Sequence, residues 1–303
     1  GSEQIVSYCD RELTKMQQVE IKTLRSGTEV VMSAEKRLAE RQESGSSIVG
    51  VKSGIQKLDM YTKGFKKSQL IILAARTSVG KTAFSVELAN AALREGKRTY
   101  YVSLEMEAEE VMQRMQSNLS EVPIAPIEDN TARATEVDKW KKATEWLTKS
   151  EHETLWIDDE PSLSFSQIRA RARKLARKGL DYMIVDYAQI ISSEKGKESE
   201  SSYNRVSYVS RMMKVLAREL SIPVILLAQL SRKADEREGK PKLSDLKESG
   251  SLEQDADIVI FLWKKEELID ERILTIAKLR TESLVMSSYF SMEPVRSSQE
   301  NQY

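Results

Sequence analysis

The sequence predicts an α/β fold in which a mostly parallel central sheet is flanked by helices. Eight short apolar runs follow one another from Leu70 onward, and helical patterns separate most of them. The runs are continuously hydrophobic, as expected for strands that are buried on both faces of a parallel sheet. A phosphate-binding motif lies between the first run and the helix that follows it. The 303 residues are enough for one such domain with a small appendage.

The appendage is a predicted helical arm over residues 1–46, and residues 47–303 form the predicted α/β domain. Gly1 and Ser2 are typical of a cloning scar, so we expect a fragment of a longer protein. Apolar residues recur at helical intervals in two stretches, which are Val6, Cys9, Leu13 and Met16, and then Val31, Ala34 and Leu38. Such a face needs a partner. It packs either on its own domain or on a neighbouring subunit, as in helix-in-groove recognition.

The predicted strands are residues 70–75, 99–104, 154–158, 181–187, 223–229, 257–263, 273–279 and 284–290. The last two lie close together in sequence, which predicts an antiparallel hairpin at the sheet edge. Between the third and fourth strands, Ser164 and Gln167 have the spacing of a capping box, and Gly179 marks the end of that helix.

Composition excludes several classes of protein. Lysine plus arginine and aspartate plus glutamate number 47 each, so no global charge favours nucleic acid or a membrane surface. One cysteine and one histidine exclude a disulfide framework and a Cys/His zinc cluster, and they fit a reducing cytoplasm. No apolar run approaches the roughly 18 residues of a membrane span, and the first residues lack the apolar core of a signal peptide.

The stretch "LIILAARTSVGKTAF" predicts a nucleotide site. In a phosphate loop the backbone N–H groups at a strand-to-helix turn bind phosphates, where the helix dipole also favours negative charge. Lys81 supplies a point charge and the Thr82 hydroxyl a magnesium ligand. Ala75 replaces the usual first glycine and is tolerated if its φ is negative. The predicted nucleotide-binding residues in this loop are Arg76, Ser78, Gly80, Lys81 and Thr82.

Two carboxylates complete the predicted site. Asp186 ends the strand "MIVD", where it serves as the second magnesium-side group with Thr82, or as a turn residue or helix cap. In ATPases of the AAA type the base that activates water directly follows this aspartate, but Tyr187 stands there. Glu105, after the strand at 99–104, is the candidate base, and its alternative role is that of an acidic residue in the first turn of a helix.

Six segments together resemble the DnaB-type replicative helicases: "AARTSVGKT", "SLEM", "MIVDYAQII", "SRMMKVLAREL", "VILLAQLSR" and "LSDLKESGSLEQDADIVIFL". The resemblance covers about Ile48 to Phe290 and includes phage-encoded relatives. It implies a RecA-like motor domain that uses ATP and Mg²⁺, forms a homo-hexameric ring around single-stranded DNA and moves 5′ to 3′ in the cytoplasm of a bacterium or a phage-infected host.

The resemblance also implies residue roles. Lys81 and Thr82 hold phosphate and magnesium, Glu105 activates water, Asp186 holds the metal through water, and Gln229 senses the γ-phosphate. Lys247, Glu248 and Gly250 match a loop that contacts the DNA backbone, although the family more often has arginine in place of Lys247. Arg232 is a further basic candidate for DNA contact.

"IAKLR" places Lys278 and Arg280 on the same face of one strand while Leu279 points to the core. They match the fingers that the family inserts into the neighbouring subunit's nucleotide site. The alternative is a pair of solvated edge-strand charges. After Arg280 the chain lacks the Asn-Gly turn that is common in the family.

The resemblance implies a helicase loader and primase as partners. The family's N-terminal domain, which helps to engage primase, has no counterpart here, and only a segment resembling its linker is present. Two other functions stay open on the sequence: a RecA-like DNA-dependent ATPase or recombinase that forms filaments, and an ATP-gated adaptor that loads another helicase. The "SLEM" and "LKESGSLEQDAD" segments argue against the first, and the complete set of base, sensor and finger argues against the second.

Overall fold

The computed structural model describes residues 25–44, 48–149, 154–192, 201–231, 239–264, 272–280 and 290–291. The chain divides into two units, Gly1–Ser47 and Ile48–Tyr303, and each is described by itself. None of the described helices is long and apolar enough to cross a membrane.

The described part of the first unit contains the helix α2 (Gly27–Ser44). A reciprocal capping box begins it: Glu29 N–H donates to Ser26 Oγ, and Ser26 N–H donates to Glu29 Oε2. The predicted apolar residues Val31, Ala34 and Leu38 all lie on this helix, and their side chains are exposed within the unit. The earlier predicted stretch from Val6 to Met16 lies outside the described residues.

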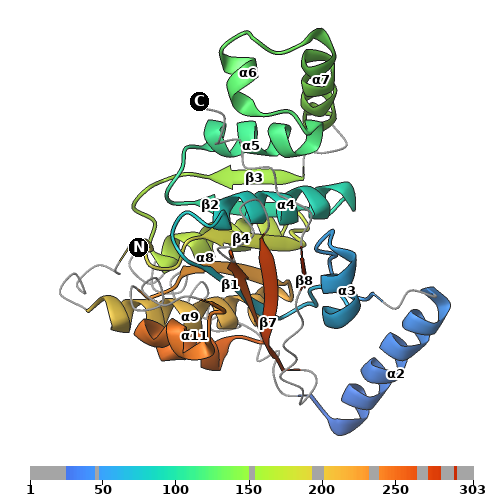
Figure 1. Cartoon of the computed structure of the whole chain (residues 1–303). Coiled ribbons are helices and arrows are strands. Elements are labelled where there is room, and N and C mark those ends of the chain that lie inside the picture. Colours follow the sequence, from blue (N-terminus) through green and yellow to red (C-terminus); the bar gives the residue numbers. More distant parts are fainter. Residues whose placement is uncertain are drawn as a thin grey trace, which may run out of the picture. The chain divides into compact units, whose positions relative to one another are not determined.

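The second unit contains one eight-stranded sheet with the order β3-β2-β4-β5-β1-β6-β7-β8 (Figure 1). The strands are β1 (Leu70–Ala75), β2 (Thr99–Ser103), β3 (Leu155–Asp158), β4 (Tyr182–Asp186), β5 (Val224–Gln229), β6 (Ile258–Trp263), β7 (Ile273–Leu279) and β8 (Phe290–Ser291). The first six are parallel, and β7 and β8 pair antiparallel at one edge. The mostly parallel sheet and its antiparallel edge were both predicted. Residues 284–289 of the last predicted strand lie outside the described residues.

Helices connect the strands. Among the described residues of the second unit they are α3 (Gln56–Thr62), α4 (Lys81–Arg94), α5 (Ala108–Ser120), α6 (Ile124–Glu128), α7 (Ala134–Thr148), α8 (Phe165–Ala176), α9 (Ser202–Leu220), the 3₁₀ helix η2 (Leu243–Ser249) and α11 (Gly250–Asp255). At the start of α8, Ser164 N–H donates to Gln167 Oε1 over 2.9 Å, which confirms the predicted cap.

Two hydrophobic clusters cover the two faces of the sheet. Side chains alternate along each strand, so Ile72 and Ala74 of β1 join α8, α9 and α11 in one cluster. Ile71 and Leu73 join α3, α4 and α5 in the other. Figure 1 shows α4 and α9 on opposite sides of the sheet. Because both faces are buried, β1 is apolar at every position, and this continuous run is what made the strand recognisable in the sequence.

Candidate nucleotide-binding and catalytic site

The carboxyl ends of four parallel strands meet at one edge of the sheet. Ala75 at the end of β1 is in register with Gln229 at the end of β5, and Ser103 at the end of β2 is in register with Asp186 at the end of β4. The strand order therefore brings the phosphate loop, Glu105, Asp186 and Gln229 to the same end of the sheet, which is where open α/β sheets usually bind their ligands.

The phosphate loop runs from the end of β1 to the start of α4. Ala75 is the buried last residue of β1, and its φ is not positive, so the missing glycine causes no strain there. The left-handed residues of this loop are Ser78, with φ of 61°, and Gly80, with φ of 99°. The left-handed conformation of Ser78 had no sequence signal, because serine carries no preference for it.

Lys81, Thr82 and Asp186 form the centre of the site. Thr82 Oγ1 donates to Asp186 Oδ2 over 2.7 Å, and Lys81 Nζ lies 3.5 Å from Asp186 Oδ1. Burial raises the pKa of the Asp186 carboxyl, and Lys81 and Thr82 oppose that shift. Burial lowers the pKa of Lys81, and the carboxylates of Asp186 and Glu105 oppose it. The Lys81 ammonium also lies 3.8 Å from the centre of the Tyr187 ring.

The same cluster fits a magnesium ion. Asp186 Oδ1 is buried and accepts no hydrogen bond from the described residues, and the Lys81 ammonium is paired with it at 3.5 Å, so this oxygen still has room to bind a metal ion or a water. It shares the site with the Thr82 hydroxyl, and Mg²⁺ binds through hard oxygen atoms with several waters kept in its shell. The donor set is therefore suitable for Mg²⁺ bound by Thr82 and, directly or through water, by Asp186.

Glu105 lies in the turn between β2 and α5. Helix α5 begins only at Ala108, so Glu105 is not an acidic residue of its first turn, and that alternative is wrong. The negative charge of the Glu105 carboxylate raises the pKa of both Lys81 and Tyr187, so Glu105 lies close to these two side chains. The turn itself is held by a hydrogen bond from Ser103 Oγ to the Met106 carbonyl, 2.7 Å long. An exposed carboxylate beside the phosphate loop has the position needed to activate a water.

Gln229 connects the end of β5 to the phosphate loop. Its Nε2 donates to Thr77 Oγ1 over 2.8 Å. The side-chain amide of Gln189, just after β4, pairs with the Gln229 backbone: Nε2 donates to the carbonyl, and Oε1 accepts from the N–H. Thr77 and Gln189 were missed in the sequence, because neither contact follows from local spacing. Arg76, predicted to bind nucleotide, donates through Nη2 to the Gly239 carbonyl over 3.4 Å.

Lys278 and Arg280 lie away from this chain's own phosphate loop. The Asp257 N–H donates to the carbonyl of Leu70, at the beginning of β1, and Asp257 in turn pairs with Arg280 Nη1 at 3.7 Å. The phosphate loop is at the other end of β1. Lys278 Nζ donates to the carbonyl of Glu253, and burial, followed by repulsion from Arg280, lowers its pKa. The two charges are therefore close together.

A β-bulge sets the direction of these side chains. The pairing of β6 with β7 shifts between Val259 and Ile260, so that Val259 opposes Lys278 and Ile260 opposes Ile276. Leu279 packs against the cluster on the α4 side of the sheet, as predicted. Lys278 reaches α11 on the other side.

The predicted DNA-contacting residues lie at the junction of η2 and α11. The expected loop is wrong for this segment, because Lys247 and Glu248 are in the 3₁₀ helix and Gly250 begins α11. Lys242 N–H donates to Asp245 Oδ2 over 2.7 Å and so caps the first turn of η2, which explains why the segment is helical. The side chains of residues 247–250 and all of Arg232 lie outside the described residues.

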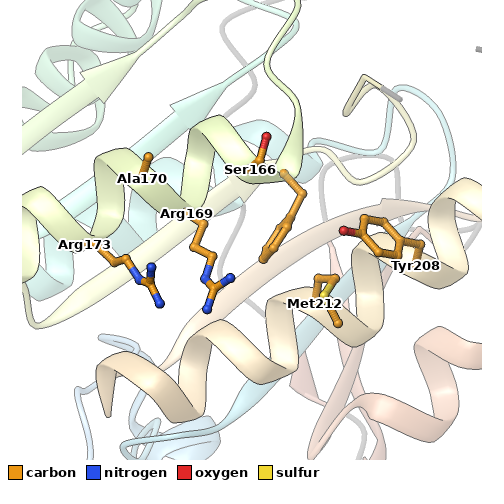
Figure 2. A pocket seen from close by; sticks show the side chains of 7 residues that line it. Ser166, Arg169, Ala170, Arg173, Tyr208 and Met212 are labelled. Atoms are coloured by element: carbon orange, nitrogen blue, oxygen red, sulfur yellow. The ribbon is translucent and has the colours of Figure 1, made fainter. Parts of the chain in front are cut away.

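A separate groove lies between α8 and α9 (Figure 2). These two helices pack on the face of the sheet opposite α4. The lining of the groove consists of Phe165, Ser166, Arg169, Ala170, Arg173, Tyr208 and Met212. The rings of Phe165 and Tyr208 meet edge to face, with centroids 6.2 Å apart. Both arginines bind Glu219 of α9. The groove thus has an apolar floor and a charged rim.

Known proteins resemble this chain in sequence. The family model described as DnaB-like helicase C terminal domain matches residues 50–288. The replicative DNA helicase DnaB of Geobacillus stearothermophilus is 42% identical over 222 residues, which are 72% of this chain and 48% of that protein. The replicative DNA helicase DnaB of Helicobacter pylori (strain ATCC 700392 / 26695) is 36% identical over 248 residues, 80% of this chain and 50% of that protein. The chain spans about half the length of these relatives.

Solved structures show the same likeness. A structure described as an ATPase domain matches with a TM-score of 0.77 and 30% identity, covering 88% of this chain and 93% of that one. A DnaB-like replicative helicase, solved in a study of its interactions with primase, matches with a TM-score of 0.74 and 29% identity, covering 96% and 71%. A KaiC-like protein from Pyrococcus horikoshii, 18% identical with a TM-score of 0.54, shares the fold alone. The predicted RecA-like α/β fold is confirmed, and the chain belongs to the DnaB-like helicase C-terminal domain family.

Proposed function

We propose that this chain is the ATP-driven motor of a replicative DNA helicase, which assembles as a homo-hexamer and moves 5′ to 3′ along single-stranded DNA in a bacterial or phage-infected cytoplasm. The observation that carries the proposal is the contact of Thr82 and Lys81 with Asp186 at the end of the phosphate loop. Replicative DNA helicases DnaB at 36% and 42% identity support it.

The residues divide the chemistry among them. The loop N–H groups and Lys81 hold the β- and γ-phosphates of ATP, while Glu105 orients the attacking water and accepts its proton. Mg²⁺, when bound by Thr82 and Asp186, neutralises charge on the phosphate oxygens. Gln229 reaches the loop through Thr77. A γ-phosphate that displaces this contact would move the end of β5.

Hydrolysis is completed at subunit interfaces. The phosphate loop follows the last residue of β1, while Arg280 is tied to Asp257 beside the first. The six residues of β1 are joined by five steps of about 3.3 Å, which separate the two ends by about 17 Å. Arg280 therefore cannot reach its own site but can reach that of a neighbour in a head-to-tail ring. Lys247 at the η2–α11 junction, with Glu248, Gly250 and Arg232, is proposed to face DNA phosphates, so that six copies of a few positive charges suffice in a neutral protein.

The helical arm, predicted over residues 1–46, is proposed to join neighbouring copies. The side chains of Val31 and Leu38 on α2 are 60% and 47% exposed, and an unpartnered apolar stripe of this kind needs a partner. We propose the α8–α9 groove of the next copy as that partner. Its apolar floor matches the stripe, and Glu35, which flanks the stripe at helical spacing, complements the arginine rim.

A charge placed on the stripe tests this contact. Leu38→Asp should dissociate the oligomer into monomers at micromolar concentration, measured by light scattering. Lys36→Asp, which puts negative charge on the opposite face of α2, should leave the oligomer intact. Equal assembly of the two variants would exclude the stripe as a contact. A helicase loader and primase are further proposed partners, in line with a structural relative that was solved in a study of its interactions with primase.

ATP turnover as a function of protein concentration, with and without single-stranded DNA, tests the function. A ring motor should show turnover that rises more steeply than linearly, increases with DNA and accompanies strand separation on a forked duplex with a 5′ tail. DNA-stimulated turnover on filaments without strand separation would favour a recombinase-like ATPase. Turnover that is linear in protein and indifferent to DNA would favour an ATP-gated adaptor.

A further inference from the structure

The start of β7 contributes a basic side chain to the phosphate loop. Arg272, directly before β7, is partly buried and donates through Nε to the carbonyl oxygen of Val79 over 2.9 Å. Ile273 is in register with Trp263 at the end of β6, and the adjacent Leu262 is in register with Ala75 at the end of β1. Arg272 is therefore fixed at the phosphate-loop end of β7, opposite the end that carries Lys278 and Arg280.

The accepting carbonyl belongs to the peptide that presents Gly80 N–H. The Val79–Gly80 bond is not cis, and in a trans peptide the C=O and N–H point in opposite directions. A donor that holds the Val79 carbonyl on one side thus directs Gly80 N–H to the other side. In phosphate loops this N–H is one of the groups that bind the β- and γ-phosphates.

The conformation of Gly80 bears on how this peptide is held. Gly80 has a φ of 99°, in the region that glycine adopts at little cost. A Cβ placed at Gly80 would meet no atom beyond its chain neighbours within 4 Å. The Gly80 carbonyl accepts from Phe84 N–H over 3.0 Å, so α4 holds the peptide after Gly80, while Arg272 holds the carbonyl of the peptide before it. A fixed cation is well suited to hold such a peptide, because hydrogen bonds from charged donors are stronger than neutral ones. Arginine also keeps its charge at all physiological pH values.

We infer that Arg272 is a positioning residue of the nucleotide site, which orients the Val79–Gly80 peptide so that the loop selects nucleotides with a β-phosphate. It acts through the Val79 carbonyl and needs no contact with the substrate. The inference rests on the proposed nucleotide site, and it adds a role for a residue that lies 193 positions from its partner in sequence.

Nucleotide titrations with the whole chain in the presence of Mg²⁺ test the role. Arg272→Ala should weaken ADP binding by about 10- to 100-fold, as expected for the loss of a charged hydrogen bond, and should leave AMP binding unchanged. Arg272→Lys retains a charged donor and should recover a large part of the ADP affinity. Arg94→Ala, at the exposed end of α4, removes the same charge and should bind ADP like the wild type.

The outcomes separate this inference from its alternatives. Unchanged ADP affinity in Arg272→Ala would overturn it. Equal losses for ADP and AMP, together with a lower melting temperature of the nucleotide-free protein, would show a structural role and would also overturn it. If the wild type prefers ADP to AMP, Arg272→Ala loses this preference, and the wild type still fails to separate DNA strands, only the proposed function would be refuted. A wild-type chain that binds no ADP would refute both.

Discussion

The position of Arg280 leads to a quantitative prediction for mixed assemblies. Arg280→Ala removes the finger and leaves the phosphate loop, whereas Lys81→Ala disables the loop and leaves the finger. Each variant alone should lose about 10³- to 10⁵-fold in ATP turnover. At a head-to-tail interface, one competent site needs the loop of one subunit and the finger of the next. With random mixing at equal amounts, about a quarter of the interfaces combine an intact loop with an intact finger.

The assay is DNA-stimulated phosphate release after the two inactive variants are mixed and allowed to exchange subunits. Turnover should recover to about a quarter of the wild-type value if sites act independently. The Arg280 side chain is 61% exposed and 3.7 Å from Asp257, so its loss should cost at most about 1 kcal/mol of folding free energy, and the melting temperature checks this. A mixture that stays as inactive as its components, despite confirmed subunit exchange, would refute the trans geometry.

Three further predictions concern the site and the core. Glu105→Gln should bind ATP normally but lose at least about 100-fold in turnover; undiminished turnover would exclude Glu105 as the base. Thr82→Val should abolish the Mg²⁺-dependent increase in ATP affinity while binding without metal is retained, whereas an equal Mg²⁺ effect in variant and wild type would place the metal elsewhere. Phe84→Ala, which empties a site 1% exposed between α4 and the sheet, should lower the unfolding free energy by about 3–5 kcal/mol in denaturant titrations, and a loss below about 1 kcal/mol would indicate a core that closes around the gap.

Much of the fold was predictable because a strand that is buried on both faces appears in the sequence as a short continuous run of apolar residues. Continuous apolar runs located β1 and β7 at their observed bounds. The Gly80–Lys81–Thr82 turn and Asp186 were recognised for a similar reason, since the turn follows one such run within a few residues and Asp186 ends another. For η2, the family resemblance implied a loop at Lys247, Glu248 and Gly250, whereas the carboxylate of Asp245 accepts from Lys242 N–H and favours a helical turn.

Contacts between residues on different strands had no comparable pattern in the sequence. Thr77 and Gln229 are 152 residues apart, and Arg272 and Val79 are 193 residues apart. Neither pair has a spacing that a helix or a strand would impose. These contacts exist because β5 and β6 both pair with β1, so that residues from distant parts of the chain line one edge.

The sequence by itself determined the first seven strands and the phosphate-loop motif, because apolar runs, glycines and helix caps are patterns within a few neighbouring residues. Only the tertiary structure decided that β7 is antiparallel to β6 and so places Arg272 at this chain's own loop and Arg280 at the opposite end. The physical reason is that strand order and direction result from packing the whole sheet between two layers of helices, and no local segment contains that information.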